Sequence, residues 1–253
     1  MQMPAVRFER CSMRYKLSKD IIIRTENAAK PEKQLSSYLA TLISRLEPVS
    51  SSFDYGCGKL RYQNVISKTT DTLAVVDSEI QLSRDQMIHG RMTSIRSLMR
   101  RSNRIYTFNV PKFGLLPDTF DRGFCLNVLS VIPSQTARLR VLQLIRSKLR
   151  PGSPCLFVVQ YRNSDFTRMI SMPNTKPWGD GFLIDSLHGY SFYGLISPDR
   201  LTSLIRRAGF EIAEHHLYDG SAFIWGRNPV QNVRLPKLKI SETKDNFQIS
   251  IRE

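Results

Sequence analysis

The sequence predicts an α/β fold with a mostly parallel sheet and helices on both of its faces. Short apolar runs alternate along the chain with segments in which apolar residues recur every three or four positions, as strands and amphipathic helices require. Such alternation is typical of parallel strands joined by right-handed crossovers. In addition, one apolar run leads directly into a turn that contains Gly56 and Gly58, and glycine-rich turns of this kind connect strand to helix in many open α/β sheets.

The first 48 residues precede this core and are predicted to form an N-terminal extension and a helix. Residues 1–32 are polar and basic, with one short apolar run at residues 20–24 that fits a strand. Residues 34–46 place their large aliphatic side chains on one face, which predicts a helix that packs before the first strand of the core. These side chains belong to Leu35, Leu39, Leu42, Ile43 and Leu46.

The glycine turn, Asp54-Tyr55-Gly56-Cys57-Gly58, is the most informative motif of the chain. Glycines at this spacing allow the backbone to approach a ligand where a side chain would clash, and the following helix can direct its N-terminus at a polar group. About twenty residues later, the next apolar run ends in Asp77, where such folds bind ribose hydroxyls. We therefore expect a nucleotide-type cofactor site, with a tight structural turn as the alternative. A dinucleotide site is disfavoured, because Arg61 replaces the third glycine of Gly-x-Gly-x-x-Gly.

Arginine residues are concentrated between the second and third predicted strands. The apolar residues of this segment, Ile95 and Met99 among them, recur at helical spacing, which predicts an amphipathic helix with a basic outer face. The segment contains no acidic residue, and this favours contact with phosphates, although an ordinary solvated helix face is the alternative. Its arginines are Arg91, Arg96, Arg100, Arg101 and Arg104.

The second half of the chain continues the alternation of strands and helices. A strand within residues 120–132 is followed by a helix at 135–149 that starts after the N-cap Ser134. A strand at 155–159 and a helix at 198–208 come next, and Gly209 ends the second helix before the last two strands. The first helix is predicted to turn Leu139, Leu142, Ile145 and Leu149 inward. Two further basic groups lie in this half of the chain, namely Arg138, Arg140, Arg146, Lys148 and Arg150, and then Arg206 and Arg207.

Four motifs in this order resemble those of the class I S-adenosylmethionine-dependent methyltransferases. They are Asp54-x-Gly56-x-Gly58, Phe120 to Pro133, Leu149-Arg150-Pro151-Gly152 before the fifth strand, and Ala208-Gly209-Phe210 before the last two strands. The resemblance implies a core at residues 49–228 and a basic tail at 229–253. It also implies the cofactor S-adenosyl-L-methionine, held by Asp54, Gly56, Gly58, Asp77 and Asn127. Leu60 departs from the family, which has a glycine at this place in the turn.

The segment from residue 162 to 197 is an addition to this core and is predicted to form a flap. It leaves the carboxyl end of the fifth strand, which is the edge of an open α/β sheet where ligands bind. The resemblance places the methyl group over Asn127 and Tyr161, and the flap would bring His188 beside them. We expect Asn127, Tyr161 and His188 to orient the acceptor, exclude water and supply a base near neutral pH. One or more of Asp185, His188 and Tyr190 are expected to border the acceptor pocket.

The charge of the chain points to an anionic partner. Lys and Arg number 37 against 22 Asp and Glu, a formal net charge of +15, and this favours nucleic acid as the methyl acceptor. A methyltransferase for a small molecule or a protein, and a non-catalytic nucleic-acid-binding relative, remain as alternatives. No apolar run approaches the length of a membrane span, and the four cysteines lack metal-ligand spacing. We expect a cytoplasmic protein without a membrane or metal partner.

Overall fold

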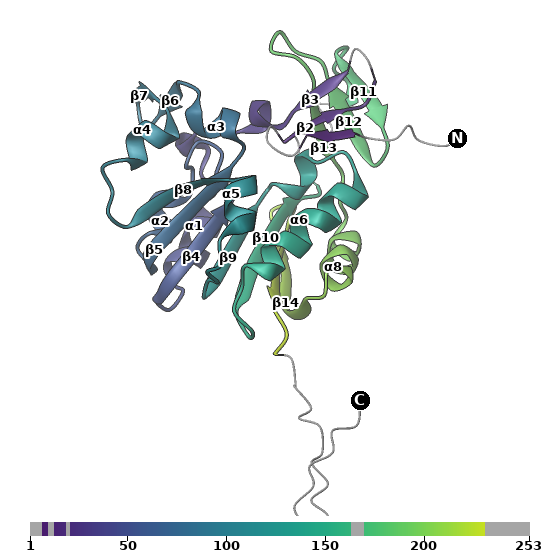
Figure 1. The fold of residues 1–253 in the computed structure, drawn as a ribbon. Helices are drawn as coiled ribbons and strands as arrows, with labels where there is room; N and C mark the ends of the chain where they lie inside the picture. Colours follow the sequence, from purple (N-terminus) through teal and green to yellow (C-terminus); the bar gives the residue numbers. More distant parts are fainter. Residues whose placement is uncertain (1–6, 10–12, 19–20, 163–169, 231–253) are drawn as a thin grey trace, which may run out of the picture.

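The computed structural model describes residues 7–9, 13–18, 21–162 and 170–230 of the chain (Figure 1). A seven-stranded sheet with the order β14-β15-β10-β9-β4-β5-β8 forms its centre. Five neighbouring strands of the sheet are parallel, and β15 runs antiparallel to both of its neighbours. The predicted α/β fold with a mostly parallel sheet is therefore confirmed. The strands are β4 (Val49–Tyr55), β5 (Thr70–Asp77), β8 (Ile105–Asn109), β9 (Arg122–Leu126), β10 (Pro154–Gln160), β14 (Glu211–Tyr218) and β15 (Ser221–Arg227).

Helices cover both faces of this sheet and divide its apolar core into two clusters. On one face, buried side chains of α5, α6 and α8 pack against the sheet. On the other face, the buried side chains come from α1, α2, α3 and α4. The helices are α1 (Ser37–Ser44), α2 (Gln63–Ile66), α3 (Glu79–Ser83), α4 (Ile95–Met99), α5 (Val110–Leu115), α6 (Gln135–Ser147) and α8 (Pro198–Arg207). The predicted helices on both faces of the sheet are thus confirmed.

Side-chain caps fix the starts of the helices that the sequence predicts. The hydroxyl of Ser36 accepts a hydrogen bond from the amide of Leu39 and so begins α1. Ser134 caps α6 and Ser197 caps α8 in the same way. The inward face of α6 differs from the prediction, because Arg138 is buried on it while Leu139 is only partly buried. The reason is an ion pair between Arg138 and Asp180, which the spacing of apolar residues cannot reveal.

The predicted amphipathic helix across the arginine segment is wrong. Residues 91–93 form strand β7 (Arg91–Thr93), which pairs with β6 (Gln86–Ile88), and only α4 is helical. His89 and Gly90 form the two-residue turn between these strands. Both have positive φ, +46° and +76°, as a type I′ hairpin turn requires. Ser94 then caps α4, since its hydroxyl accepts from the amide of Ser97. Met92, an apolar residue of this segment, is 68% exposed on the hairpin.

Two small sheets stand above the carboxyl edge of the large one and form a lid, which we define as residues 7–9, 13–18, 21–34 and 170–197 (Figure 1). One sheet has the order β1-β2-β3 and the other β11-β12-β13. The two are linked where Ile23 bridges to Tyr190 and the amide of Arg24 donates to the Tyr190 carbonyl at 2.8 Å. The strands are β1 (Arg7–Glu9), β2 (Arg14–Lys16), β3 (Ile22–Arg24), β11 (Thr175–Trp178), β12 (Gly181–Ile184) and β13 (Ser191–Gly194).

The predicted basic tail at 229–253 lies almost entirely outside the described residues. The strand expected at residues 20–24 is present as β3, from residue 22 onward. Among the described residues, none of the helices has the length and hydrophobicity that a bilayer crossing requires. Within the same ranges, no cluster of three or more His, Cys, Asp or Glu side chains is arranged to hold a metal ion.

Candidate functional site

A cavity of about 450 Å³ lies between the carboxyl edge of the large sheet and the lid. Its floor comes from the glycine turn after β4 and from the ends of β5, β9 and β10. Its roof comes from β12, β13 and a segment of the lid, residues 25–34, that we call the strap. The lining residues used below are Met13, Glu26, Ala29, Lys30, Gln34, Asp54, Gly56, Cys57, Gly58, Lys59, Arg61, Tyr62, Asp77, Gln81, Asn127, Val128, Val131, Gln160, Ile184, Ser191, Phe192 and Tyr193.

The backbone of the glycine turn has left-handed conformations at three alternate positions. Gly56, Gly58 and Leu60 have φ of +77°, +57° and +60°. At Gly56 a Cβ atom would lie 2.3 Å from Cγ2 of Val128, so this position requires glycine. Leu60 has this left-handed conformation although it carries a side chain, which is fully buried among apolar residues. The turn therefore carries local strain at Leu60.

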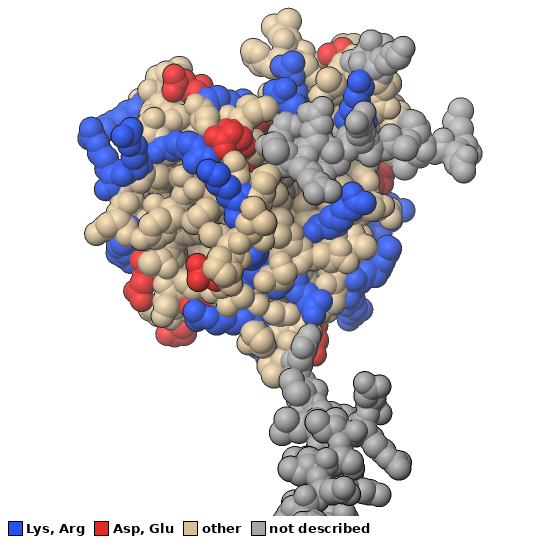
Figure 2. Space-filling view, viewed as in Figure 1, with Lys and Arg blue, Asp and Glu red and all other residues tan. Residues whose placement is uncertain are grey.

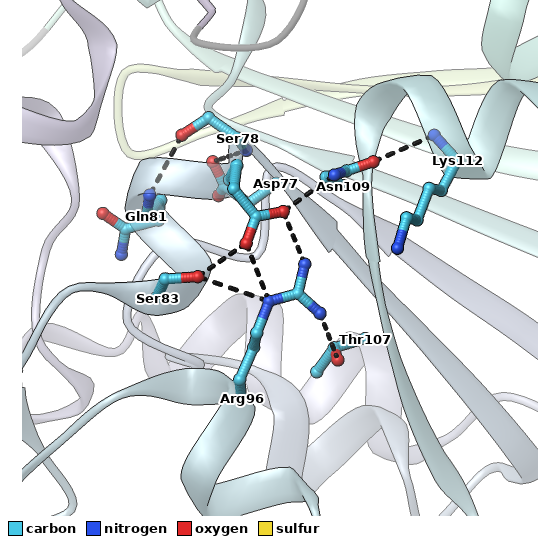
Figure 3. Close-up of polar contacts among 9 residues, drawn as sticks. Asp77, Ser78, Gln81, Ser83, Arg96, Thr107, Asn109 and Lys112 are labelled. Atoms are coloured by element: carbon cyan, nitrogen blue, oxygen red, sulfur yellow. Dashed lines mark hydrogen bonds and ion pairs between the residues drawn. The ribbon is translucent and has the colours of Figure 1, made fainter.

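Asp77 ends β5 and holds the glycine turn in place. One of its carboxylate oxygens accepts from the amide of Gly58 at 2.9 Å. The other accepts from the amide of Ser78 at 2.7 Å, a bond that Figure 3 shows. A carboxylate offers about four lone-pair sites, so both oxygens can also accept from hydroxyl groups of a ligand in the cavity. Burial raises the pKa of Asp77 to about 6, while these two amide bonds act in the opposite direction.

Asp54 is a second buried carboxylate at the same cavity. Burial, followed by the charge of Asp77, raises its pKa to about 7, and Arg61 partly opposes this. In the described part of the chain, no lysine or arginine forms an ion pair with Asp54 or Asp77. Two desolvated acids in one cavity suit a ligand that brings positive charge. S-adenosylmethionine carries an ammonium and a sulfonium group, and the residues present fit its methionine and ribose portions.

Glu79, the neighbouring acid, is occupied within the protein. Arg96 donates to both of its carboxylate oxygens, at 3.0 and 2.6 Å, and Asn109 donates at 2.7 Å. Figure 3 shows Arg96 from α4 and Asn109 from β8 pointing toward the same carboxylate, while the hydroxyl of Thr107, also on β8, accepts a hydrogen bond from Arg96. The bond to Arg96 is the largest of the effects that lower the pKa of Glu79 to about 2. Of the two acids at the end of β5, Asp77 therefore lines the cavity and Glu79 does not.

Asn127 follows β9 and is the one predicted acceptor-site residue that lines the cavity within the described part of the chain. Its φ is +61°, and its amide donates to the carbonyl of Val158 at 2.8 Å, which fixes the strained backbone. Its side-chain Oδ1 is buried and has no hydrogen-bond partner in the described residues. A buried amide oxygen without a partner is costly, so this atom is suited to accept a hydrogen bond from a ligand.

The structure does not bring the other predicted acceptor residues into the cavity lining. The amides of Tyr161 and Arg162 both donate to the Gly220 carbonyl, at 2.8 and 3.0 Å, and the Tyr161 side chain packs against the core. His188 is exposed, and its carbonyl accepts from Arg24 and Asn27. Asp185 and Tyr190 are also outside the lining. Among the described lining residues there is no histidine.

Other residues, to which the sequence analysis gave no role, line this part of the cavity. Gln160 from β10 accepts a hydrogen bond from the Tyr193 hydroxyl at 3.0 Å, and both line the cavity. Phe192 is buried beside them. The sequence signal for this part of the flap is its aromatic content, Tyr190, Phe192 and Tyr193. The strap has no recognisable sequence motif. Its contact with the glycine turn, where Ala29 faces Gly58, joins residues far apart in the sequence and could not be predicted from local patterns.

The predicted nucleic-acid-binding arginines divide into two groups. Arg96 pairs with Glu79, and Arg104 donates to the carbonyls of Thr70 and Asp71. Arg91, Arg100 and Arg101 are exposed around the β6–β7 hairpin and the end of α4. The structure brings none of the five into the lining of the cavity.

Comparisons with known proteins place the chain among others with this architecture. No family model matches. An uncharacterized Escherichia coli K12 protein, YmfD, is 30% identical over 206 residues, which are 80% of this chain and 90% of YmfD. Two solved structures share the fold with a TM-score of 0.53. One is an O-methyltransferase family protein from Burkholderia thailandensis, 14% identical, with 78% of this chain and 57% of that chain covered. The other is a SAM-dependent methyltransferase from Methanosarcina mazei, 16% identical, with 78% and 99% covered.

Proposed function

The chain belongs to the same family as YmfD of Escherichia coli and has the class I methyltransferase fold, and on this basis we propose that it is an S-adenosylmethionine-dependent methyltransferase. The observation that carries the proposal is the pair of buried carboxylates, Asp54 and Asp77, on either side of the glycine turn at the floor of a roofed cavity. This arrangement lies at the carboxyl edge of the sheet, where open α/β folds bind ligands.

Each element of the site has a role in this proposal. Asp77 binds the ribose hydroxyls, and Asp54 faces the positively charged methionine portion. The backbone of Gly56 and Gly58 leaves room for the cofactor, and Asn127 Oδ1 accepts a hydrogen bond from it or from the acceptor. The cofactor supplies a methyl group already activated on a sulfonium. The protein therefore contributes mainly alignment and exclusion of water, which the lid provides.

A small molecule is the acceptor class that the cavity favours. The lid covers the site from two sides, and its apolar wall, with Val131, Ile184 and Phe192, suits a compact acceptor. The charge of the chain suggested a nucleic-acid partner, but many of its basic side chains form ion pairs or hydrogen bonds within the protein. Arg138 pairs with Asp180, Arg150 pairs with Asp121, and Lys148 donates to the carbonyl of Leu116. On the face drawn in Figure 2, lysine and arginine side chains lie in several separate groups.

Nucleic acid remains a second candidate acceptor because of one specific surface. Arg91, Arg100 and Arg101 are exposed, and no ion pair holds them within the described part of the chain. Phosphates could contact this surface while a nucleotide enters the cavity. Binding to RNA or DNA that weakens steeply with salt favours this candidate over the first.

The proposal is tested in two steps. Titration calorimetry measures binding of S-adenosylmethionine and S-adenosylhomocysteine to the full chain, and tritium transfer from labelled cofactor is then followed into RNA, DNA, protein and small-molecule fractions. We expect cofactor binding and label in the small-molecule fraction. Absence of binding contradicts the assignment of the site, and binding without transfer into any fraction contradicts the enzymatic role.

A further inference from the structure

Three basic side chains line the cavity beside the glycine turn and the strap. Lys59 and Arg61 follow Gly58 in the chain, and Lys30 belongs to the strap. All three are partly exposed, as expected for groups at the rim of a cavity. Arg61 stacks over the Tyr62 ring and donates to the Gln34 carbonyl at 3.4 Å, which holds its charge at this rim. In the described part of the chain, none of the three forms an ion pair with a carboxylate.

Once a cofactor is bound, the negative charges of the carboxylates in the cavity are too few to neutralise the three basic side chains and the cofactor. Glu26 is already paired with Arg14 at 2.7 Å, so Asp54 and Asp77 are the carboxylates that remain. S-adenosylmethionine brings two positive groups and one carboxylate. Even if one basic side chain binds that carboxylate, the other two face the cavity without a partner. A charge excess in a partly desolvated cavity is unfavourable unless an anion enters with the acceptor.

The cavity lining also includes apolar side chains. Phe192 is fully buried there, and Met13, Val131 and Ile184 lie on the same lining. The same lining contains three uncharged polar groups, the Asn127 amide, the Gln160 amide and the Tyr193 hydroxyl. An acceptor that fills this space has an apolar body at the lid and a negative group at the rim.

On the basis of the proposed function, we propose that the methyl acceptor is a small anionic molecule whose carboxylate or phosphate is bound by Lys30, Lys59 and Arg61. The cations lie on two elements, the strap and the start of the helical turn after Gly58, so the anion also draws the strap toward the glycine turn. The rim thereby acts in selection of the acceptor as well as in closure of the cavity over it.

The first part of the test measures the charge of the product. Methyl-labelled S-adenosylmethionine and the full chain are incubated with a small-molecule cell extract, and the products are separated on an anion-exchange resin. We expect the label in the retained, anionic fraction. Label confined to the unretained fraction overturns this inference and leaves the proposed function intact. Label in no fraction overturns the proposed function, and this inference with it.

The second part assigns the anion to the three cations. The combined variant Lys30→Gln, Lys59→Gln and Arg61→Gln should lower transfer into the anionic product at least tenfold. A second triple variant carries Lys30→Gln and Lys59→Gln together with Arg61→Lys, which retains the charge at position 61. This variant should transfer more methyl label into the anionic product than the variant with Arg61→Gln. Lys68→Gln, at an exposed lysine outside the cavity lining, is the matched control and should leave transfer unchanged.

Cofactor affinities separate the two sources of a carboxylate. S-adenosylhomocysteine carries the amino-acid carboxylate, and 5′-methylthioadenosine lacks it. We expect the combined variant to bind both compounds within threefold of the wild-type affinities. If it loses S-adenosylhomocysteine binding but retains 5′-methylthioadenosine binding, the rim serves the cofactor, and the inference about the acceptor is overturned. Unchanged transfer into the anionic product overturns it as well.

Discussion

The carboxylate of Asp77 accepts a hydrogen bond from the backbone amide of Gly58 at 2.9 Å. This bond joins the end of β5 to the glycine turn after β4, so the two parts of the proposed cofactor site are fixed relative to each other before a ligand arrives. The second oxygen accepts from the amide of Ser78. Because both bonds use backbone donors, their geometry depends on the fold and on few side chains.

Replacing Asp77 by alanine should therefore weaken cofactor binding. Loss of the hydroxyl acceptors in a buried site should cost about 1–3 kcal/mol, on the order of 5- to 150-fold in affinity. Calorimetry with S-adenosylhomocysteine measures it, and Asp77→Asn, which retains one oxygen for Gly58, separates ligand contact from support of the turn. Asp71→Ala, at an exposed acid near the other end of β5, is the control. Wild-type affinity in a folded Asp77→Ala variant would show that ribose binds elsewhere.

Cofactor affinity should rise with pH. Burial raises the pKa of Asp77 to about 6 and that of Asp54 to about 7, so Asp77 loses most of its bound proton and Asp54 about half of its own as the pH rises from 5 to 7. A cationic ligand binds the ionised forms, so its binding releases protons, and affinity should increase on the order of tenfold over this range. S-adenosylhomocysteine lacks the sulfonium charge and should show a smaller rise. A flat profile for S-adenosylmethionine between pH 5 and 7 would contradict the assignment of both acids.

The same two carboxylates determine how folding responds to pH. Their pKa values are higher in the folded protein than the ordinary value of 3.8, so the folded state binds more protons than the unfolded state between about pH 4 and 7. The contribution of these two groups to stability is thus most favourable at acid pH and declines as the pH rises through 6 to 7. Asp54→Asn should flatten this decline in denaturant titrations at several pH values. A steeper decline in that variant would mean that other groups govern it.

Leu60 provides a test of backbone strain in the glycine turn. Its left-handed conformation costs roughly 1–2 kcal/mol, while truncation of a buried leucine costs about 2–5 kcal/mol. Both Leu60→Gly and Leu60→Ala should therefore be destabilised. At ordinary positions glycine is less stable than alanine by about 0.5–1 kcal/mol, but here the glycine variant should be at least as stable, because it relieves the strain. Free energies of unfolding from urea titrations decide the order, and a clearly less stable glycine variant would exclude strain at this residue.

The sequence predicted the parts of this molecule that local patterns determine. The glycine turn, the capped helix α6 and the order of strands and helices follow from short-range spacing. The β6–β7 hairpin was missed because each of its strands has only three residues. In addition, Ile95 and Met99 lie at helical spacing, which predicted a longer helix across this segment. Burial of Arg138 was missed because its partner is 42 positions away in the chain. Contacts of this kind depend on the folded chain, and the same is true of the strap over Gly58.

The exposed arginines of the hairpin region give a direct test of the second candidate acceptor. Reversing Arg91, Arg100 and Arg101 to glutamate should reduce any binding to RNA or DNA. The dependence of binding on salt should become flatter by about 0.7–0.9 log units for each phosphate that the variant no longer neutralises. Cofactor affinity should not change, since none of the three lines the cavity. Filter binding at several salt concentrations measures the slope. If the wild-type protein binds no nucleic acid in a salt-dependent way, this candidate is excluded.

The buried ion pair between Arg138 and Asp180 should be essential for the position of the lid. The Arg138 side chain is 1% exposed and connects three segments, because it also donates to the carbonyls of Leu129 and Ile132 at 3.0 and 2.9 Å. Asp180 lies in the turn between β11 and β12, so the pair joins the lid to α6 and to the loop after Asn127.

Removing one partner leaves a buried charge uncompensated, so Asp180→Ala should lower the free energy of unfolding by about 3–5 kcal/mol. Replacing both residues, with Arg138→Met and Asp180→Ala together, removes the charge and should recover part of this loss. Denaturant titration of the two single variants and the double variant measures the coupling. Asp185→Ala, at an exposed acid of the same lid, should be nearly neutral. If the double variant is as unstable as the sum of the single variants, the two residues act independently, and the ion pair does not hold the lid.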